Sequence, residues 1–310
     1  MAMLPLPDLP QLKRARWPLV ALTLAVACAG KIAEEATAAI PSTDIHLIAL
    51  SYDGGELRFG PPKNITHRPG YDNQPWFIPG QNAFYFSGMG ADTLTNLYRY
   101  DLSSGATVPQ PSSPDAEYSP QNPMGNANAI TVVRVEVDGA QRLWQYEGAA
   151  KSPLMQEITT IGYYIWVTES RLLMFLIGDT LTLHTYDFAT GVDEYLLDNP
   201  GRTFKRVPGS ALISFIHKVS EQEWWIKTFD PATGAIEPLV RTLPEREDFA
   251  WLPDGRIIMS GEHSLHGWSP GGAWQELITF TDPALQGITR LAVSPGGEWL
   301  ALVSVEAAAE

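Results

Sequence analysis

The chain has 310 residues, of which 45% are hydrophobic and 18% are charged, a balance that supports a packed core and excludes a disordered chain. It carries 21 Lys and Arg against 35 Asp and Glu, a formal net charge of −14 at pH 7. This acidic excess argues against nucleic-acid binding, which needs basic patches, and against electrostatic adhesion to anionic lipid.

The first predicted element is a secretory signal peptide over residues 1–27. Three basic residues lie at positions 13, 14 and 16, and an eleven-residue apolar run, Trp17–Ala27, follows them. A basic region, a short apolar run and small residues are typical of a signal peptide, and the run is too short to span a bilayer. We therefore expect an exported protein.

Cys28 follows Ala25-Val26-Ala27 and is the only cysteine, so no intramolecular disulfide can form. Its position resembles a bacterial lipobox, in which the cysteine becomes the lipidated new N-terminus, although Ala25 stands where such sites usually have Leu. This predicts a protein of the periplasm or outer membrane, attached to the membrane only by a lipid on Cys28. Cleavage beside it without lipidation, giving a soluble secreted protein, is the alternative. Residues 28–43, rich in Ala, are predicted to be a tether.

A repeated turn organises the rest of the chain. Short aromatic or aliphatic runs end at a proline–glycine turn five times, at Pro79-Gly80, Pro123-Met124-Gly125, Pro208-Gly209, Pro253-Asp254-Gly255 and Pro295-Gly296-Gly297. The successive prolines are 44, 85, 45 and 42 residues apart, and 85 is two steps. A period of about 43 residues built from short strands and tight turns indicates a β-propeller.

A second series of turns, interleaved with the first, has the same period. Its clearest copies are Tyr100-Asp-Leu-Ser-Ser-Gly105, Tyr186-Asp-Phe-Ala-Thr-Gly191 and Phe229-Asp-Pro-Ala-Thr-Gly234. In each copy the Asp can bond the backbone two residues on, and the Gly accepts a positive φ, as hairpin loops require. The two series together predict inner and outer strand pairs in every repeat.

Chain order then gives six blades of four antiparallel strands. Inner pairs are predicted near residues 71–90, 116–136, 160–177, 201–217, 246–260 and 287–306, and outer hairpins near 93–111, 141–156, 179–198, 222–241 and 262–281. The sixth inner pair has no outer hairpin after it, whereas Asp44–Thr66 precedes every inner pair. We therefore expect the N-terminal strands to complete the last blade, which hides the sheet edges. The predicted propeller spans residues 44–306, with a disordered tail at 307–310.

Three segments carry a resemblance to a known family. Gln74–Gly80, Phe249–Ile258 and Ala292–Ala301 resemble the WD40-like PD40 repeat, which is typical of the propeller of TolB and similar bacterial periplasmic proteins. The resemblance covers about residues 44–306 and implies a six-bladed propeller of the cell envelope. Blades two, three and four depart from the pattern. The motif is shared by binding scaffolds and by propellers attached to peptidases, so it fixes the fold better than the function.

The sequence contains no familiar catalytic or metal-binding motif. It has no Gly-x-Ser-x-Gly, His-Glu-x-x-His, Walker loop or Cys-x-x-Cys pattern. His263 and His266, the tightest histidine pair, would face opposite sides of a strand, which is wrong for chelation. We therefore predict no catalytic residue, metal site or cofactor.

Propeller geometry places a ligand at the mouth of the central channel, where the innermost strand of every blade begins. Counting back from each turn gives the six predicted site residues: Gln74, Tyr118, Tyr163, Thr203, Asp248 and Arg290. Such a set can recognise a peptide end or a sugar. Alternatively, these polar side chains satisfy one another and water around the channel.

Together these patterns predict a non-enzymatic, monomeric scaffold of the cell envelope that binds a protein or peptide partner. The alternative is an envelope enzyme, a glycan lyase or hydrolase, that uses paired carboxylates such as Asp72 and Asp248. A glycosidase pair needs carboxyl groups roughly 5–10 Å apart across the bound sugar.

Overall fold

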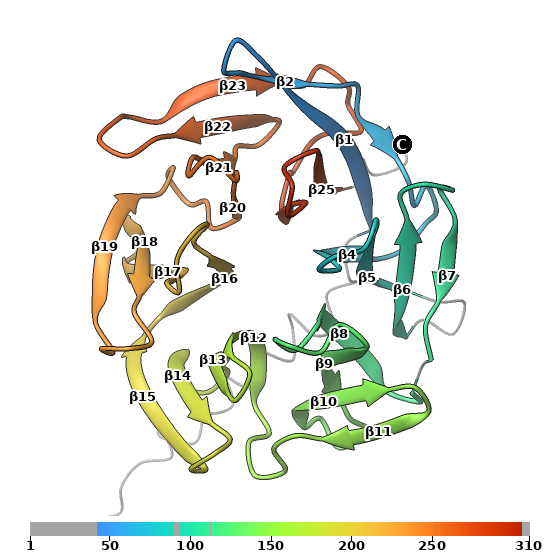
Figure 1. Cartoon of the computed structure of the whole chain (residues 1–310), viewed down its shortest axis with the longest axis vertical. Helices are drawn as coiled ribbons and strands as arrows, with labels where there is room; N and C mark the ends of the chain where they lie inside the picture. The colour runs from blue at the N-terminus through green and yellow to red at the C-terminus, as the bar shows by residue number, and fades with distance from the viewer. Residues whose placement is uncertain (1–41, 90–93, 112, 306–310) are drawn as a thin grey trace, which may run out of the picture. The chain divides into compact units, whose positions relative to one another are not determined.

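The computed structural model describes residues 42–89, 94–111 and 113–305, which form a ring of six antiparallel sheets (Figure 1). Within these ranges the chain folds into strands and turns, without a helix. No helix of the described residues is therefore long and apolar enough to cross a membrane. The predicted signal peptide, Cys28 and the predicted tail lie outside the described residues, as does the predicted tether except for Ser42 and Thr43.

Five blades are each built from four consecutive strands, which run in order from the channel outward. The first two blades are β4 (Asp72–Phe77), β5 (Ala83–Met89), β6 (Thr95–Asp101) and β7 (Thr107–Pro109), and β8 (Ala116–Gln121), β9 (Ala129–Val135), β10 (Gln141–Glu147) and β11 (Ala150–Pro153). The next three are β12 (Ile161–Thr168), β13 (Arg171–Leu176), β14 (Thr182–Asp187) and β15 (Val192–Asp198); β16 (Pro200–Arg206), β17 (Ile213–Ser220), β18 (Glu223–Phe229) and β19 (Ile236–Arg241); and β20 (Phe249–Trp251), β21 (Ile257–Ser260), β22 (Ser264–Trp268) and β23 (Gln275–Thr279).

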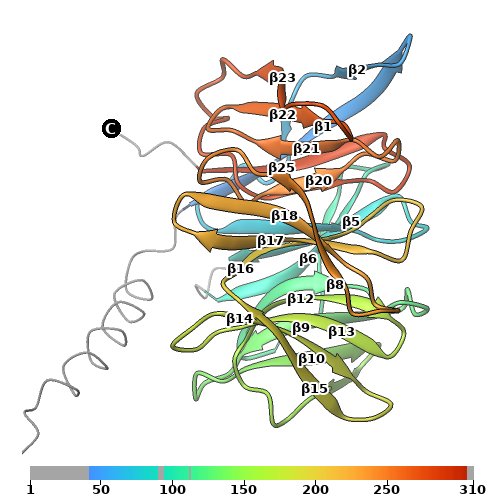
Figure 2. The same ribbon diagram turned by 90° about the vertical axis from the view of Figure 1, so that its left-hand side faces the viewer.

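The sixth blade joins the two ends of the described chain. Its inner strands are β24 (Leu291–Val293) and β25 (Trp299–Val305), and its outer strands are β1 (Thr43–Asp53), β2 (Glu56–Phe59) and the short β3 (Lys63–Asn64). β1 pairs antiparallel with β25 over seven residues, from Thr43 opposite Val305 to Ala49 opposite Trp299. Figure 2 shows β1 beside β25 in an edge view. The prediction of six blades with an N-terminal closure is confirmed.

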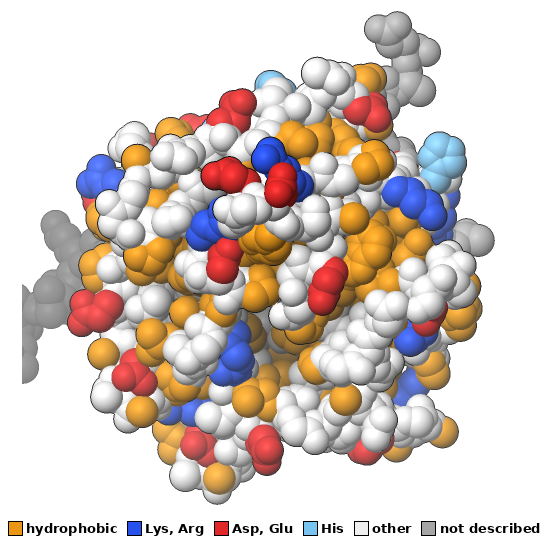
Figure 3. All heavy atoms as spheres, turned by 45° about the horizontal axis from the view of Figure 1, so that its top comes forward, with side chains coloured by type: hydrophobic (Ala, Val, Ile, Leu, Met, Phe, Trp, Pro, Cys, Tyr) orange, Lys and Arg blue, Asp and Glu red, His pale blue; other side chains and the backbone are white. Residues whose placement is uncertain are grey.

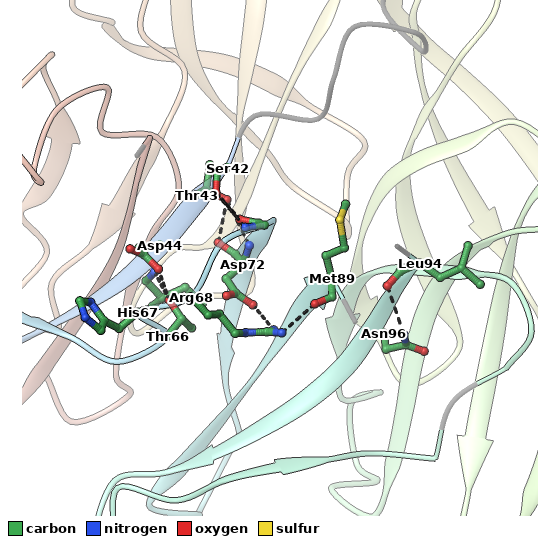
Figure 4. Close-up of polar contacts among 12 residues, drawn as sticks. Ser42, Thr43, Asp44, Thr66, His67, Arg68, Asp72, Met89, Leu94 and Asn96 are labelled. Carbon is green, nitrogen blue, oxygen red and sulfur yellow. Dashed lines mark hydrogen bonds and ion pairs between the residues drawn. The ribbon is translucent and has the colours of Figure 1, made fainter. Parts of the chain in front are cut away.

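Polar contacts tie the start of β1 to the first blade as well (Figure 4). The Thr43 hydroxyl donates to the backbone oxygen of Asp72 at 3.0 Å. Arg68 forms an ion pair with the Asp72 carboxylate at 2.6 Å and donates to the backbone oxygen of Met89 at 2.7 Å. β1 therefore contacts blade one as well as its partner β25 in blade six, and these contacts hold the ring closed.

The hydrophobic core lies between neighbouring blades. The second strand of each blade is buried on both faces, as in β5, where six consecutive residues are buried. Aromatic and aliphatic side chains fill the wedge between blades: Phe84 and Phe86 of blade one pack in one cluster with Ala301 and Val303 of blade six. Large rings suit this position because they bury much apolar area in a space that widens outward.

The proline–glycine turns explain the sequence period physically. Each links the innermost strand of a blade to the next strand outward, and its glycine has a positive φ, for example 84° at Gly255 and 80° at Gly297. Only glycine adopts this conformation without steric cost. At Gly297 a Cβ atom would also lie 2.8 Å from the ring of Pro253 in the preceding blade. The turn of blade six therefore packs against the turn of blade five.

The six innermost strands surround a central channel. Contacts run from β4 to β8, then β12, β16, β20 and β24, and from β24 back to β4. We call the end where these strands begin the start side, and the end with the proline–glycine turns the turn side. Side chains from six separate parts of the sequence converge in this channel.

The central channel as candidate binding site

Five of the six predicted site residues line one cavity in the channel, which we call the start-side cavity. Gln74, Tyr163 and Thr203 lie on β4, β12 and β16, and Asp248 and Arg290 immediately precede β20 and β24. The cavity has a volume of about 80 Å³, enough for a few water molecules and well below the several hundred Å³ of small-molecule sites.

Tyr118, the sixth predicted residue, does not line this cavity. It lies on β8 and packs edge-on against the ring of Tyr71, with centroids 6.2 Å apart and planes at 72°. Its side chain is half-buried. The structure therefore places Tyr118 in an aromatic pair with Tyr71 and not in the lining of the start-side cavity.

Arg290 is already occupied by protein groups. Its guanidinium forms an ion pair with Asp248 at 2.8 Å and donates to the Tyr163 hydroxyl at 3.0 Å. Thr203 donates to the same carboxylate oxygen of Asp248 at 3.3 Å. Burial alone would lower the pKa of Arg290, but Tyr163 and Asp248 outweigh it and raise the pKa. Since blades three and six are opposite each other, the Arg290–Tyr163 contact crosses the channel.

A second ion cluster joins blades four and five at the same end. Arg202 contacts Glu247 at 2.6 Å, and Lys218 lies 3.2 Å from the other oxygen of that carboxylate. Burial would raise the pKa of Glu247, but the Arg202 and Lys218 charges and the hydrogen bonds from Arg202 hold it at about 2. Glu247 is therefore a structural anion rather than an acid poised to transfer a proton.

Two neighbouring strands carry matching backbone irregularities at the channel wall. Gln74 and Ser119 have φ angles of 59° and 53°, and the pairing registers of β4 and β8 shift at these positions. The Ser119 N–H donates to the Gln74 side-chain oxygen at 2.7 Å. Bulges of this kind turn side chains out of the regular alternation, and strained residues cluster at binding sites.

Next to these bulges, several polar atoms lack a hydrogen-bond partner among the described residues: Trp76 Nε1, Ser119 Oγ, Gln121 Oε1 and Asn122 Oδ1. The orientation of the Gln121 amide is fixed because its nitrogen donates to the Tyr164 backbone oxygen at 2.6 Å. A buried polar atom without a partner costs free energy. One donor, two acceptors and one hydroxyl that can donate or accept are therefore left unsatisfied by the described residues.

The turn side of the channel is wide and mostly apolar. Two adjoining cavities of about 450 and 920 Å³ share Trp76, Pro79, Lys205 and Arg206 in their walls, and we call them together the turn-side hollow. Trp166, Trp251 and Met124 add apolar surface. Figure 3 shows one face of the ring, where hydrophobic side chains reach the surface around a hollowed middle.

Two cations at the end of β16 give the turn-side hollow its charge. Lys205 reaches across to donate to the Leu291 backbone oxygen at 2.8 Å, and burial lowers its pKa to about 8. Arg206 donates to the Trp166 backbone oxygen at 2.8 Å. Every other arginine of the described ranges has a carboxylate within 4.0 Å, whereas Arg206 has only backbone oxygens and the Met124 sulfur.

Lys205 and Arg206 are not among the site residues predicted from the sequence, although the sequence contains a signal for them. Aligning the five turns on their prolines places Lys205 where the other repeats have Trp, Pro or Ala, and Arg206 where they have Phe, Gln, Trp or Val. In the five aligned repeats, Lys205 and Arg206 are the only charged residues at the third and second positions before the proline of the turn. A charged residue at a position that is uncharged in the other repeats indicates a role other than packing between blades.

Elsewhere, His266 of the histidine pair, and Trp224 and Trp225 on β18, make local contacts. His266 hydrogen-bonds Ser264 at 3.0 Å, and no group of three His, Cys, Asp or Glu within the described part of the chain could hold a metal ion. Lys218 lies 4.2 Å from the ring centre of Trp224, and Arg241 lies 5.3 Å from that of Trp225.

Comparison with known proteins identifies the fold. No family model and no curated protein matches the chain. Among solved structures, the putative TolB of Agrobacterium tumefaciens aligns with a TM-score of 0.64 at 13% identity, over 86% of this chain and 99% of that one. TolB of Acinetobacter baumannii gives 0.53 at 14% identity, over 94% and 72%. The fold is that of a TolB-type six-bladed propeller.

The TolB-type fold also occurs in an enzyme among the similar structures. An oligogalacturonate lyase in complex with manganese aligns with a TM-score of 0.54 at 14% identity, over 80% of each chain. Identities this low establish the common architecture alone. The function therefore depends on the side chains of this channel.

Proposed function

We propose that this protein is a non-enzymatic scaffold of the cell envelope that binds a protein or peptide partner through its central channel. The observation that carries the proposal is the turn-side hollow: a wide apolar opening with two cations that have no carboxylate partner among the described residues. Apolar walls with a few placed polar groups are the usual composition of a binding pocket.

The carboxylates considered for catalysis are less suited to proton transfer. Asp72 is 1% exposed and paired with Arg68, and Asp248 is 6% exposed and paired with Arg290. A general acid or nucleophile must reach the substrate, and these groups are committed to arginines. The likeness in fold to an oligogalacturonate lyase supports the enzyme alternative, which assays for glycan turnover test directly.

For the cellular location we propose export, with a lipid on Cys28 as the membrane attachment in the periplasm or outer membrane. The N-terminal sequence pattern and the TolB-type fold support this proposal. A soluble secreted form without the lipid is the alternative. We propose a monomer, since β1 and β25 of the same chain close the ring without a strand from a second copy.

The test is capture of a partner from envelope extract, with glycan and peptide substrate panels assayed in parallel. Ala211→Trp places a large ring at an exposed position of the turn-side hollow, and Ala189→Trp is the matched control on an exposed outer turn. We expect stoichiometric capture by the wild type and by Ala189→Trp, loss of capture by Ala211→Trp, and no turnover. Turnover of a glycan by the wild type would support the lyase alternative instead.

A further inference from the structure

We propose that the turn-side hollow binds the C-terminus of its partner polypeptide, with the terminal carboxylate held by Arg206 and Lys205 and the last side chain against Trp76 and Trp251. The inference rests on the proposed function, because it specifies which part of a protein the scaffold recognises.

The charge of the hollow selects an anion. The chain carries a formal net charge of −14, yet the walls of both turn-side cavities contain two cations and no carboxylate among the described residues. Arg206 retains donors that no carboxylate of these residues uses, and its planar fork suits a carboxylate. The walls of the hollow therefore present positive charge to a ligand, although the protein as a whole is acidic.

The shape of the channel selects a chain end. The turn-side cavities, of about 450 and 920 Å³, lead to the start-side cavity of about 80 Å³, and Lys205 lines all three. In the wall of that cavity, the Arg290–Tyr163 hydrogen bond crosses the channel between opposite blades. A channel that narrows and is crossed by a hydrogen bond accepts a terminus more readily than a continuous chain. An N-terminal ammonium would meet two cations, so the C-terminus fits.

The composition of the wall suits a peptide better than a glycan. Trp76 Nε1, Gln121 Oε1 and Asn122 Oδ1 lack a hydrogen-bond partner among the described residues, but these atoms are buried and do not face a ligand directly. All three residues line the cavities where the terminal residues would lie. A glycan would instead need many polar groups in the plane of its hydroxyls, whereas prolines, tryptophans and small apolar side chains dominate these walls.

The experiment uses two fluorescein-labelled pentapeptide libraries that end in Leu, Phe or Trp, one with a free carboxyl terminus and one with an amidated terminus. We expect the full chain to bind the free-acid library at least about tenfold more tightly, the effect of a charge-assisted hydrogen bond. Arg206→Ala and Lys205→Ala should each lose about tenfold in affinity, and Arg206→Lys should lose less. Arg58→Ala, on β2 of the outer part of blade six with a side chain that is 60% exposed, is the matched control.

Each outcome decides between the proposals. Equal binding of acid and amide libraries, or unchanged binding by an Arg206→Ala variant with a wild-type melting curve, overturns the C-terminal inference. If Ala211→Trp still abolishes capture of a partner in that case, the scaffold function stands without it. Binding of oligogalacturonate with turnover, and of neither peptide library, overturns both. Arg206→Lys keeps the test valid if the alanine variant unfolds.

Discussion

Removing the closing strands should unfold the whole propeller. The perturbation is deletion of residues 43–66, which carry β1, β2 and β3. The deletion leaves β25 with an unpaired edge along the seven residues that β1 covers, and such an edge favours aggregation.

The size of the effect follows from the side chains that are lost. Ile45, Leu47, Ile48 and Leu50 are each at most 7% exposed, and burying an aliphatic side chain of this size contributes about 1.5–3 kcal/mol. Four of them contribute about 6–12 kcal/mol, which is comparable with the whole stability of a domain, about 5–15 kcal/mol. We therefore expect no cooperative unfolding transition in the deletion variant.

A circular permutant provides the matched control. Because Thr43 lies opposite Val305, residues 67–305 followed by a two-residue Asn-Gly turn and then residues 43–66 should form an ordinary hairpin at this junction. Urea unfolding monitored by tryptophan fluorescence should show a single transition for the permutant and none for the deletion. A deletion variant with the wild-type midpoint would refute the closure as a source of stability.

Three further predictions concern single residues. Arg290→Ala should destabilise the fold by about 3–5 kcal/mol in urea unfolding, because it leaves the Asp248 carboxylate buried without its partner. The pKa of Glu247, held at about 2 against 4.5 for the ordinary group, contributes about 3 kcal/mol of stability that is fully present above pH 5 and lost as the pH falls towards 2; Glu247→Gln should show a shallower acid transition. Cys28→Ala should move the protein from the membrane to the soluble fraction, since acyl chains bind lipid by about 0.8 kcal/mol per buried methylene, and retention after a high-salt wash would contradict the lipid anchor.

The architecture could be predicted from the sequence because each blade repeats the same local chemistry. A turn that needs glycine at a positive φ, as at Gly255, recurs in five of the six blades, so spacing alone counts the blades. The closure followed from a missing outer hairpin after residue 306 and an unassigned segment at Asp44–Thr66. Both observations depend only on the order of the segments along the chain, which can be read from the sequence.

The sequence could predict which side chains converge in the start-side cavity, but not how these side chains pair with one another. Counting from the turns placed Gln74, Tyr163 and Arg290 in one cavity, because equivalent positions of equivalent strands face the same axis. Whether the Arg290 guanidinium is available to a ligand depends on its contact with Tyr163, a residue 127 positions away in the sequence. Such pairing across the channel depends on side-chain lengths and rotamers, which the periodicity of the sequence does not contain.

The antiparallel pairing of β1 with β25 also sets the order of events in folding. The Ser304 hydroxyl contacts the His46 ring at 3.2 Å across 258 positions of sequence, so the first strand made is among the last to find its partner. Contacts this distant in sequence slow folding because the loop between them must be closed first. During synthesis β1 therefore stays without its main partner until residues 299–305 of β25 have been made.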